Sequence, residues 1–267
     1  MSNVWHLRPT VRQRAGRFTS YAIGAAVLVV LALTADWPTI GHQFFNLEVA
    51  AQMWPAIITI ALKNTLWITF LSFVLGMLLA VALAVLKVAG GPLGWFAVAF
   101  IEFFRGIPAL LTIFGAAFVI PIAFEGFKFP GGRVGAAVLG LTLVTGAYGA
   151  EIIRAGIQAV PRGQLEAARS LGMGSGQTMF WVVLPQAFRI VIPPVTNEFV
   201  MLLKDSSLVY IVGLGVFEKE LTTFGRDALS TTGSPTPLFM VAIAYLVVTL
   251  PLTYLVGLLE KRLDTKR

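Results

Sequence analysis

Apolar residues along this chain fall into six long runs separated by shorter polar segments. The runs occupy residues 18–35, 57–86, 93–124, 134–160, 180–203 and 238–259. A bilayer core of about 30 Å needs roughly 20 apolar residues in a helix, so these runs predict transmembrane helices. The pattern therefore predicts an all-α membrane protein with about six spans.

Glycine and proline interrupt several of the predicted spans. Gly106 and Pro108 break the third run, Pro193 and Pro194 lie inside the fifth, and Pro251 lies inside the sixth. Such breaks are tolerated in membranes where neighbouring helices or a water-filled cavity satisfy the freed backbone groups. The pattern favours a bundle around a pathway. The partly apolar residues 208–217 are too few to span, which predicts a re-entrant or surface helix.

Composition supports lipid as the main solvent. Charged residues make up 12% of the chain, about half of the roughly 25% that is usual in soluble domains. Cysteine is absent, which excludes disulfides, thiolate zinc sites and a cysteine nucleophile. The two histidines, His6 and His42, lie far apart and outside the spans. No metal-ligand spacing or Ser-His-Asp arrangement is present, so neither a metal site nor an enzyme is predicted.

The net charge of +7 is explained by topology. Arginine and lysine concentrate in residues 1–17, 161–178 and 261–267, whereas the loops on the other side mix basic with acidic residues. Cytoplasmic segments carry this excess of basic residues, so both termini and the loop 161–178 are predicted to be cytoplasmic. Binding to nucleic acid is not needed to account for the charge.

The cytoplasmic loop carries the strongest local pattern. Pro161 suits a helix start and Gly172 suits a C-terminal turn. Leu165, Ala168 and Leu171 fall near one face of the short helix between them. This helix is too short and too charged to span the bilayer. Its residue types suit a helix that projects from the membrane and binds in a groove of a partner protein. The alternative is a surface helix that only joins two spans.

The same loop carries a family motif. Glu166-Ala167-Ala168, then Gly172, then Leu184-Pro185 resembles the EAA loop of ABC importer permeases, with Val182 where the family often has isoleucine. Segments 104–108, 147–157, 184–187 and 203–208 resemble the polar amino acid branch of that family. The resemblance covers roughly residues 57–262.

The resemblance implies a fold and a set of partners. It implies the type I ABC importer permease fold, with a first helix at 18–35 before a five-helix core at 56–260, and a coupling helix at about 162–175. Coupling to a separate ATPase is assigned by the resemblance to Glu166, Ala167, Ala168, Gly172, Leu184 and Pro185. ATP and Mg would then bind the ATPase, since this chain has no phosphate-binding loop and no cofactor of its own. A second permease subunit, a solute-binding protein outside the cell and the lipid of a bacterial inner membrane complete the expected partners.

Charged residues inside the spans are candidates for the transport path. Ionisable groups in mid-bilayer cost about 2.5–3.5 kcal/mol on insertion scales, so they find a partner or water. A substrate path is hypothesised at Tyr148, Glu151, Asn197 and Glu198. A structural or gating role is hypothesised for Glu102, Arg105, Arg154, Lys204, Asp205 and Ser206. The alternatives are neutralisation within one helix, through the i,i+3 pairs Glu102–Arg105 and Glu151–Arg154, and an ordinary helix terminus capped by Asp205 or Ser206.

Two other functions compete with an ATP-driven importer. An ion-coupled secondary amino acid transporter would carry inverted repeats and an ion site near the midplane, and neither is evident. A membrane-embedded enzyme lacks a catalytic constellation.

Overall fold

The computed structural model describes the backbone of residues 11–264 and the side chains of residues 19–263. The ends of the predicted cytoplasmic termini, residues 1–10 and 265–267, lie outside the described residues, as do the side chains of Arg12, Arg14 and Arg17. The chain divides into two units, Met1–Asn46 and Leu47–Arg267.

The first unit contains two described helices. Helix α1 spans Val11–Thr34, so it begins before the predicted residue 18. Helix α2 spans Trp37–Phe44 and was not predicted, because its eight residues are too few to stand out as a hydrophobic run. Asp36 caps α2 by accepting a hydrogen bond from the Thr39 amide at 3.1 Å.

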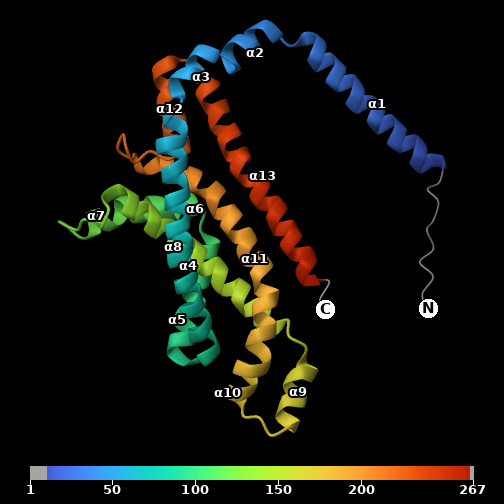
Figure 1. Ribbon diagram of the computed structural model, residues 1–267, viewed down its shortest axis with the longest axis vertical. Helices are drawn as coiled ribbons and strands as arrows, with labels where there is room; N and C mark the ends of the chain where they lie inside the picture. Colours follow the sequence, from blue (N-terminus) through green and yellow to red (C-terminus); the bar gives the residue numbers. More distant parts are fainter. Residues whose placement is uncertain (1–10, 265–267) are drawn as a thin grey trace. The chain divides into compact units, whose positions relative to one another are not determined.

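Every regular element of the second unit is helical within the described residues (Figure 1). In chain order these are α3 (Leu47–Met53), the π-helical η1 (Ile57–Leu62), α4 (Lys63–Ala89), α5 (Gly91–Gly106), α6 (Ala109–Phe114), the π-helical η2 (Gly115–Val119), α7 (Ile120–Ala123), α8 (Gly132–Gln158), α9 (Arg162–Ser170), α10 (Ser175–Thr178), the π-helical η3 (Met179–Val183), α11 (Leu184–Asp205), the 3-10 helix η4 (Ser206–Val212), α12 (Leu221–Thr232) and α13 (Thr236–Asp264).

Four helical stretches are long and apolar enough to cross a membrane: Ile57–Ala89, Gly132–Gln158, Ser175–Val212 and Thr236–Leu263. Two further apolar helices, Gly91–Gly106 and Ala109–Ala123, pass the same test only together and meet at 109°. Counting each bent helix pair as one span, including the pair that contains α1, gives up to six. The predicted all-helical architecture with several apolar helices is confirmed, and the break falls at Gly106 and Pro108 as the sequence indicated.

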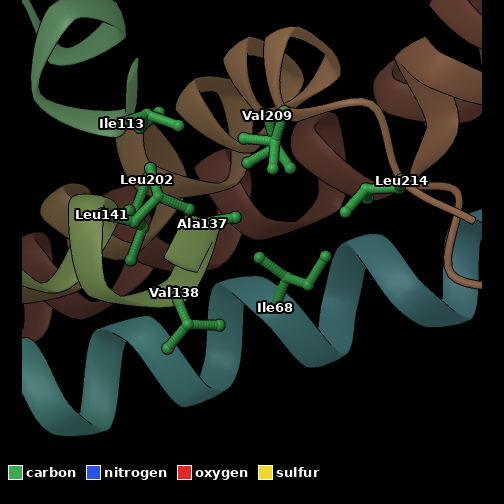
Figure 2. Packing of buried hydrophobic residues seen from close by; sticks show 9 residues of the cluster. Ile68, Ile113, Ala137, Val138, Leu141, Leu202, Val209 and Leu214 are labelled. Carbon is green, nitrogen blue, oxygen red and sulfur yellow. The ribbon is translucent and has the colours of Figure 1, made fainter. Parts of the chain in front are cut away.

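Close packing of α4 against α8 forms the centre of the second unit. A Cβ at Gly76 would lie 2.7 Å from Thr145, and one at Gly149 would lie 2.8 Å from the Cβ of Ala80. Small residues let helix backbones approach closely in lipid, where packing drives association. The main buried cluster joins this pair to the following elements: Ile68, Ile113, Ala137, Val138, Leu141, Leu202, Val209, Val212 and Leu214 (Figure 2).

The segment after α11 differs from what the sequence suggested. A helix within 208–217 was expected, but η4 ends at Val212, residues 213–219 are non-helical and α12 follows. The predicted cap at Asp205 or Ser206 is wrong, because neither side chain caps η4 and the Ser206 hydroxyl donates to the Leu203 carbonyl at 2.7 Å. The cap lies instead at Glu220, whose carboxylate accepts from the Thr222 and Thr223 amides at the start of α12.

Candidate functional site

The break between α5 and α6 lies beside a cavity that is lined by both apolar and charged residues. Helix α5 stops at Gly106 because Ile107 precedes Pro108 and adopts an extended conformation at φ −96° and ψ 136°. A residue before proline is disfavoured in the helical region, so the chain must turn at this point. Non-helical backbone is tolerated at membrane depth where it lines a cavity or is covered by protein.

A cavity of about 320 Å³ lies against this break. It is lined by Arg105, Gly106, Ile107, Pro108, Ala109, Val144, Tyr148, Glu198, Met201 and Asp205. The lining therefore brings together the end of α5, the start of α6, the middle of α8 and the C-terminal half of α11. One cationic and two acidic side chains share this space within a strongly apolar chain.

Arg105 is the central polar group of the cavity. Its guanidinium carbon lies 5.7 Å from the centroid of the Tyr148 ring, within the range of a cation–π contact. Its Nη1 lies 3.8 Å from a carboxylate oxygen of Glu102, so the predicted pairing within α5 is confirmed. Among the described residues, no hydrogen-bond partner reaches the buried Nε of Arg105.

Glu151 belongs to a different polar cluster and is not among the residues lining the cavity. It accepts a hydrogen bond from Arg154 Nε at 2.9 Å, confirming the predicted i,i+3 pair. It also meets Lys87 Nζ of α4 at 3.1 Å, a contact that sequence spacing could not reveal. Arg154 Nη1 donates onward to Gln158 at 2.6 Å. The cluster ties α4 to α8 near the end of α8 that leads into α9.

The remaining predicted path and gate residues divide between the cavity and its surroundings. Glu198 and Asp205 line the cavity, whereas Asn197 and Lys204 are exposed and do not line it. Ser206 is fully buried behind Asp205. The cavity also uses Met201 and Val144, which sequence reasoning missed because apolar side chains in an apolar span carry no distinguishing signal.

Helix α9 forms the loop element that the sequence singled out. Pro161 precedes its first residue and Gly172 turns the chain at φ +82°, a left-handed conformation that favours glycine. The helix ends at Ser170, so it is shorter than the predicted 162–175. Leu165 packs against the buried cluster of Val160, Val183 and Ala187, which joins α9 to the ends of α8 and α11.

The outer face of α9 is small and polar, followed by one large apolar side chain. Glu166 and Ala167 are exposed, whereas Ala168 is buried against the protein itself. Leu171 was expected to share a face with Leu165 and Ala168, but it is 84% exposed because it follows the helix end. Leu184 and Pro185 are exposed at the start of α11.

The arrangement matches a family of membrane transport components. Residues 72–265 match the family described as binding-protein-dependent transport system inner membrane component. The chain belongs to this family. It is therefore a membrane subunit of a transport system and not an enzyme.

Named relatives of this subunit are amino acid permeases. The chain is 42% identical over 196 residues to the probable glutamine ABC transporter permease protein GlnM of Bacillus subtilis, covering 72% of this chain and 85% of that one. It is 35% identical over 254 residues to the arginine transport system permease protein ArgU of Corynebacterium glutamicum, covering 88% and 76%.

Solved structures agree with the fold. A crystal structure of an amino acid ABC transporter with histidines superposes at a TM-score of 0.73 and 36% identity, over 80% of this chain and 96% of that one. An inward-facing MetNI methionine ABC transporter superposes at 0.65 with 19% identity, over 80% and 98%, which bears on the fold alone. The predicted ABC importer permease fold is confirmed.

Proposed function

We propose that this subunit forms the membrane pathway of an ATP-driven importer for polar amino acids, and that the cavity beside Arg105 receives the solute in transit. The observation that carries this proposal is the meeting of Arg105, Glu198 and Asp205 in one cavity of about 320 Å³. That volume is at the lower end of ligand pockets, which suits a single small solute. A cation beside carboxylates complements a zwitterion.

The cavity residues take distinct roles in this proposal. Arg105 binds the solute's carboxylate, since guanidinium groups form strong charge-assisted bonds with carboxylates. Glu198 and Asp205 accept from the ammonium group, and Tyr148 holds Arg105 in place through its ring. The relatives named for glutamine and arginine transport support the amino acid class.

ATP hydrolysis takes place on a partner ATPase that binds ATP and Mg. This partner binds a surface on and beside α9 that is formed by the exposed residues Glu166, Ala167 and Leu171. Closure of the ATPase moves α9, and the Leu165 cluster carries that movement into α8 and α11, both of which line the cavity. A second permease subunit completes the pathway, which opens alternately to each side.

The orientation proposed for the subunit places both termini and α9 in the cytoplasm of a bacterial inner membrane. Arginine-rich residues 1–17 and the basic loop 161–178 support it through the positive-inside bias. The opposite side then meets the solute-binding protein. Similarity to ABC permeases disfavours the ion-coupled secondary transporter as an alternative.

Reconstituted uptake tests the proposal. The subunit is assembled in liposomes with its ATPase and binding protein, and ATP-dependent uptake of radiolabelled polar amino acids is measured. R105M and E198Q should each lower uptake at least tenfold, because each variant removes a charged group that binds the solute in a semi-enclosed site. L78A on the exposed face of α4 is the control and should transport normally. Uptake that ignores ATP and follows an ion gradient would contradict the proposal.

A further inference from the structure

Two large apolar side chains stand at the tip of the non-helical segment between η4 and α12. Phe217 is 82% exposed and Val216 is 68% exposed. Their neighbours on both sides are buried, since Leu214 belongs to the main cluster and Glu220 is fully buried. The exposed tip is therefore short and is anchored in the protein at each end.

The backbone of this tip is held in one conformation by several bonds. The side-chain amide of Asn64 on α4 donates to the carbonyls of Phe217 at 2.8 Å and Lys219 at 3.1 Å. Lys219 Nζ lies 2.6 Å from a carboxylate oxygen of Asp227 on α12. A surface ordered before contact loses less conformational entropy on binding, which favours affinity.

The tip lies at the end of α11 that is opposite to α9. Helix α11 has 22 residues, which corresponds to about 33 Å and is enough to cross the hydrocarbon core. Helix α9 packs at its start, and residues 213–219 follow its far end through η4, near α12 at the other end of this unit in Figure 1. The candidate span Ser175–Val212 is long enough to cross the hydrocarbon core and ends directly before the tip, which places residues 213–219 at the end of that span.

We propose that Phe217 and Val216 form a docking anchor for the solute-binding protein. This inference rests on the orientation in the proposed function, which places residues 213–219 on the outer side. The family is binding-protein-dependent, so a soluble protein must meet this subunit from that side. Rigid, exposed aromatic side chains are typical of the few residues that dominate binding energy at interfaces.

The tip also defines what its partner must offer. Phe217 requires an apolar socket, and the exposed carboxylate of Glu218 beside it favours a basic rim on that socket. Asp205, which lines the cavity, precedes the tip in the chain, and only the short helix η4 (Ser206–Val212) separates the two.

Stimulation of the ATPase by the binding protein measures the anchor directly. In the complete reconstituted transporter, F217A should raise the half-saturating concentration of binding protein about tenfold, while activity without binding protein stays unchanged. F127A, in the non-helical segment before α8, is the matched aromatic control. It should leave the dependence of ATPase activity on binding-protein concentration unchanged. Equal curves for wild type and F217A, or equal shifts for F127A and F217A, would overturn the proposal.

A single label separates protein contact from membrane contact. The chain has no cysteine, so F217C gives one attachment point in this subunit for an environment-sensitive fluorophore. Emission that shifts on adding binding protein supports docking. Quenching by brominated lipid without such a shift makes the tip a membrane-interface anchor and rejects the proposal. Absent ATP-dependent uptake in the wild type counts against the proposed function instead, whereas normal uptake with an unshifted F217A curve counts only against the anchor.

Discussion

Glu151 shows how a charged residue in a span can serve the scaffold. Its carboxylate meets Lys87 from α4 and Arg154 from its own helix, and the side chains of Lys87 and Glu151 are 20% and 21% exposed. Both partners neutralise a charge that would otherwise be costly at this depth. The hypothesis that Glu151 contacts the solute stays a prediction, and these ion pairs favour a structural role.

Two variants distinguish those roles. E151Q and K87M each remove the Lys87–Glu151 pair, so each should destabilise the protein by about 1–2 kcal/mol, less than a fully buried pair would. Thermal unfolding in detergent measures the loss, and uptake is compared at equal amounts of folded protein. The structure predicts that both variants transport normally. Uptake that falls in E151Q and not in K87M would show that Glu151 meets the solute.

Glu220, at the start of α12, gives the stability of the protein a dependence on pH. Burial raises the pKa of its carboxyl above the usual value of 4.5, although hydrogen bonds from Thr223 and Thr222 oppose this. Between 4.5 and the raised pKa, the folded protein keeps a proton that the unfolded chain has lost. The free energy of unfolding therefore decreases as pH rises through this range.

Thermal unfolding measured from pH 5 to pH 8 checks that sign. The neutral side chain in E220Q cannot titrate, so the stability of wild type relative to E220Q should fall as pH rises and then become constant. E125Q, which alters an exposed carboxylate in another non-helical segment, should follow the wild-type profile. Parallel profiles for wild type and E220Q would show that Glu220 has the same pKa in both states.

At the scale of elements, α9 separates into an inward face that belongs to the fold and an outward surface that does not. Leu165 is partly buried and packs against Val183 and Ala187, whereas Leu171 projects from the protein at 84% exposure. The proposed ATPase contact therefore depends on a residue whose loss removes no internal packing.

L171D should weaken the complex with the ATPase without changing stability. A carboxylate in an apolar contact leaves an unpaired charge on docking, which costs several kcal/mol and should lower the retained ATPase at least tenfold. Co-purification measures retention, and thermal unfolding of the isolated subunit verifies the fold. S175D places the same charge on the exposed start of α10 and should retain the ATPase. Full retention by L171D would exclude this residue from the contact.

The sequence predicted elements better than their relations in space. The hydrophobic runs located the spans, and Gly106 and Pro108 located the break in the third, because both signals are local. The 109° bend and the pairing of Lys87 with Glu151, which are 64 positions apart, depend on tertiary packing and could not be predicted. Of the four residues hypothesised for the substrate path, Tyr148 and Glu198 line the cavity, but nothing local to α8 or α11 revealed that Glu151 and Asn197 do not.

At the scale of the whole molecule, residues 47–267 contain the cavity and the contact surfaces that the proposed function uses. The cavity, α9, the Phe217 tip and all four buried hydrophobic clusters of the described residues lie in this unit. The family match begins only at residue 72. The superposition on the solved amino acid ABC transporter uses 80% of this chain and covers 96% of the other chain. The core therefore has the packing it needs without α1 and α2.

Deletion of residues 1–46 should accordingly leave a folded and active permease. The first span usually helps to set orientation, so a cleavable signal sequence must deliver residue 47 to the outer side in its place. The truncated subunit should unfold within a few degrees of the full chain, because no cluster loses a member. ATP-dependent uptake should persist in liposomes with the ATPase and binding protein. A truncated chain that inserts correctly yet fails to assemble with its partners would assign the first unit a role in holding the complex together.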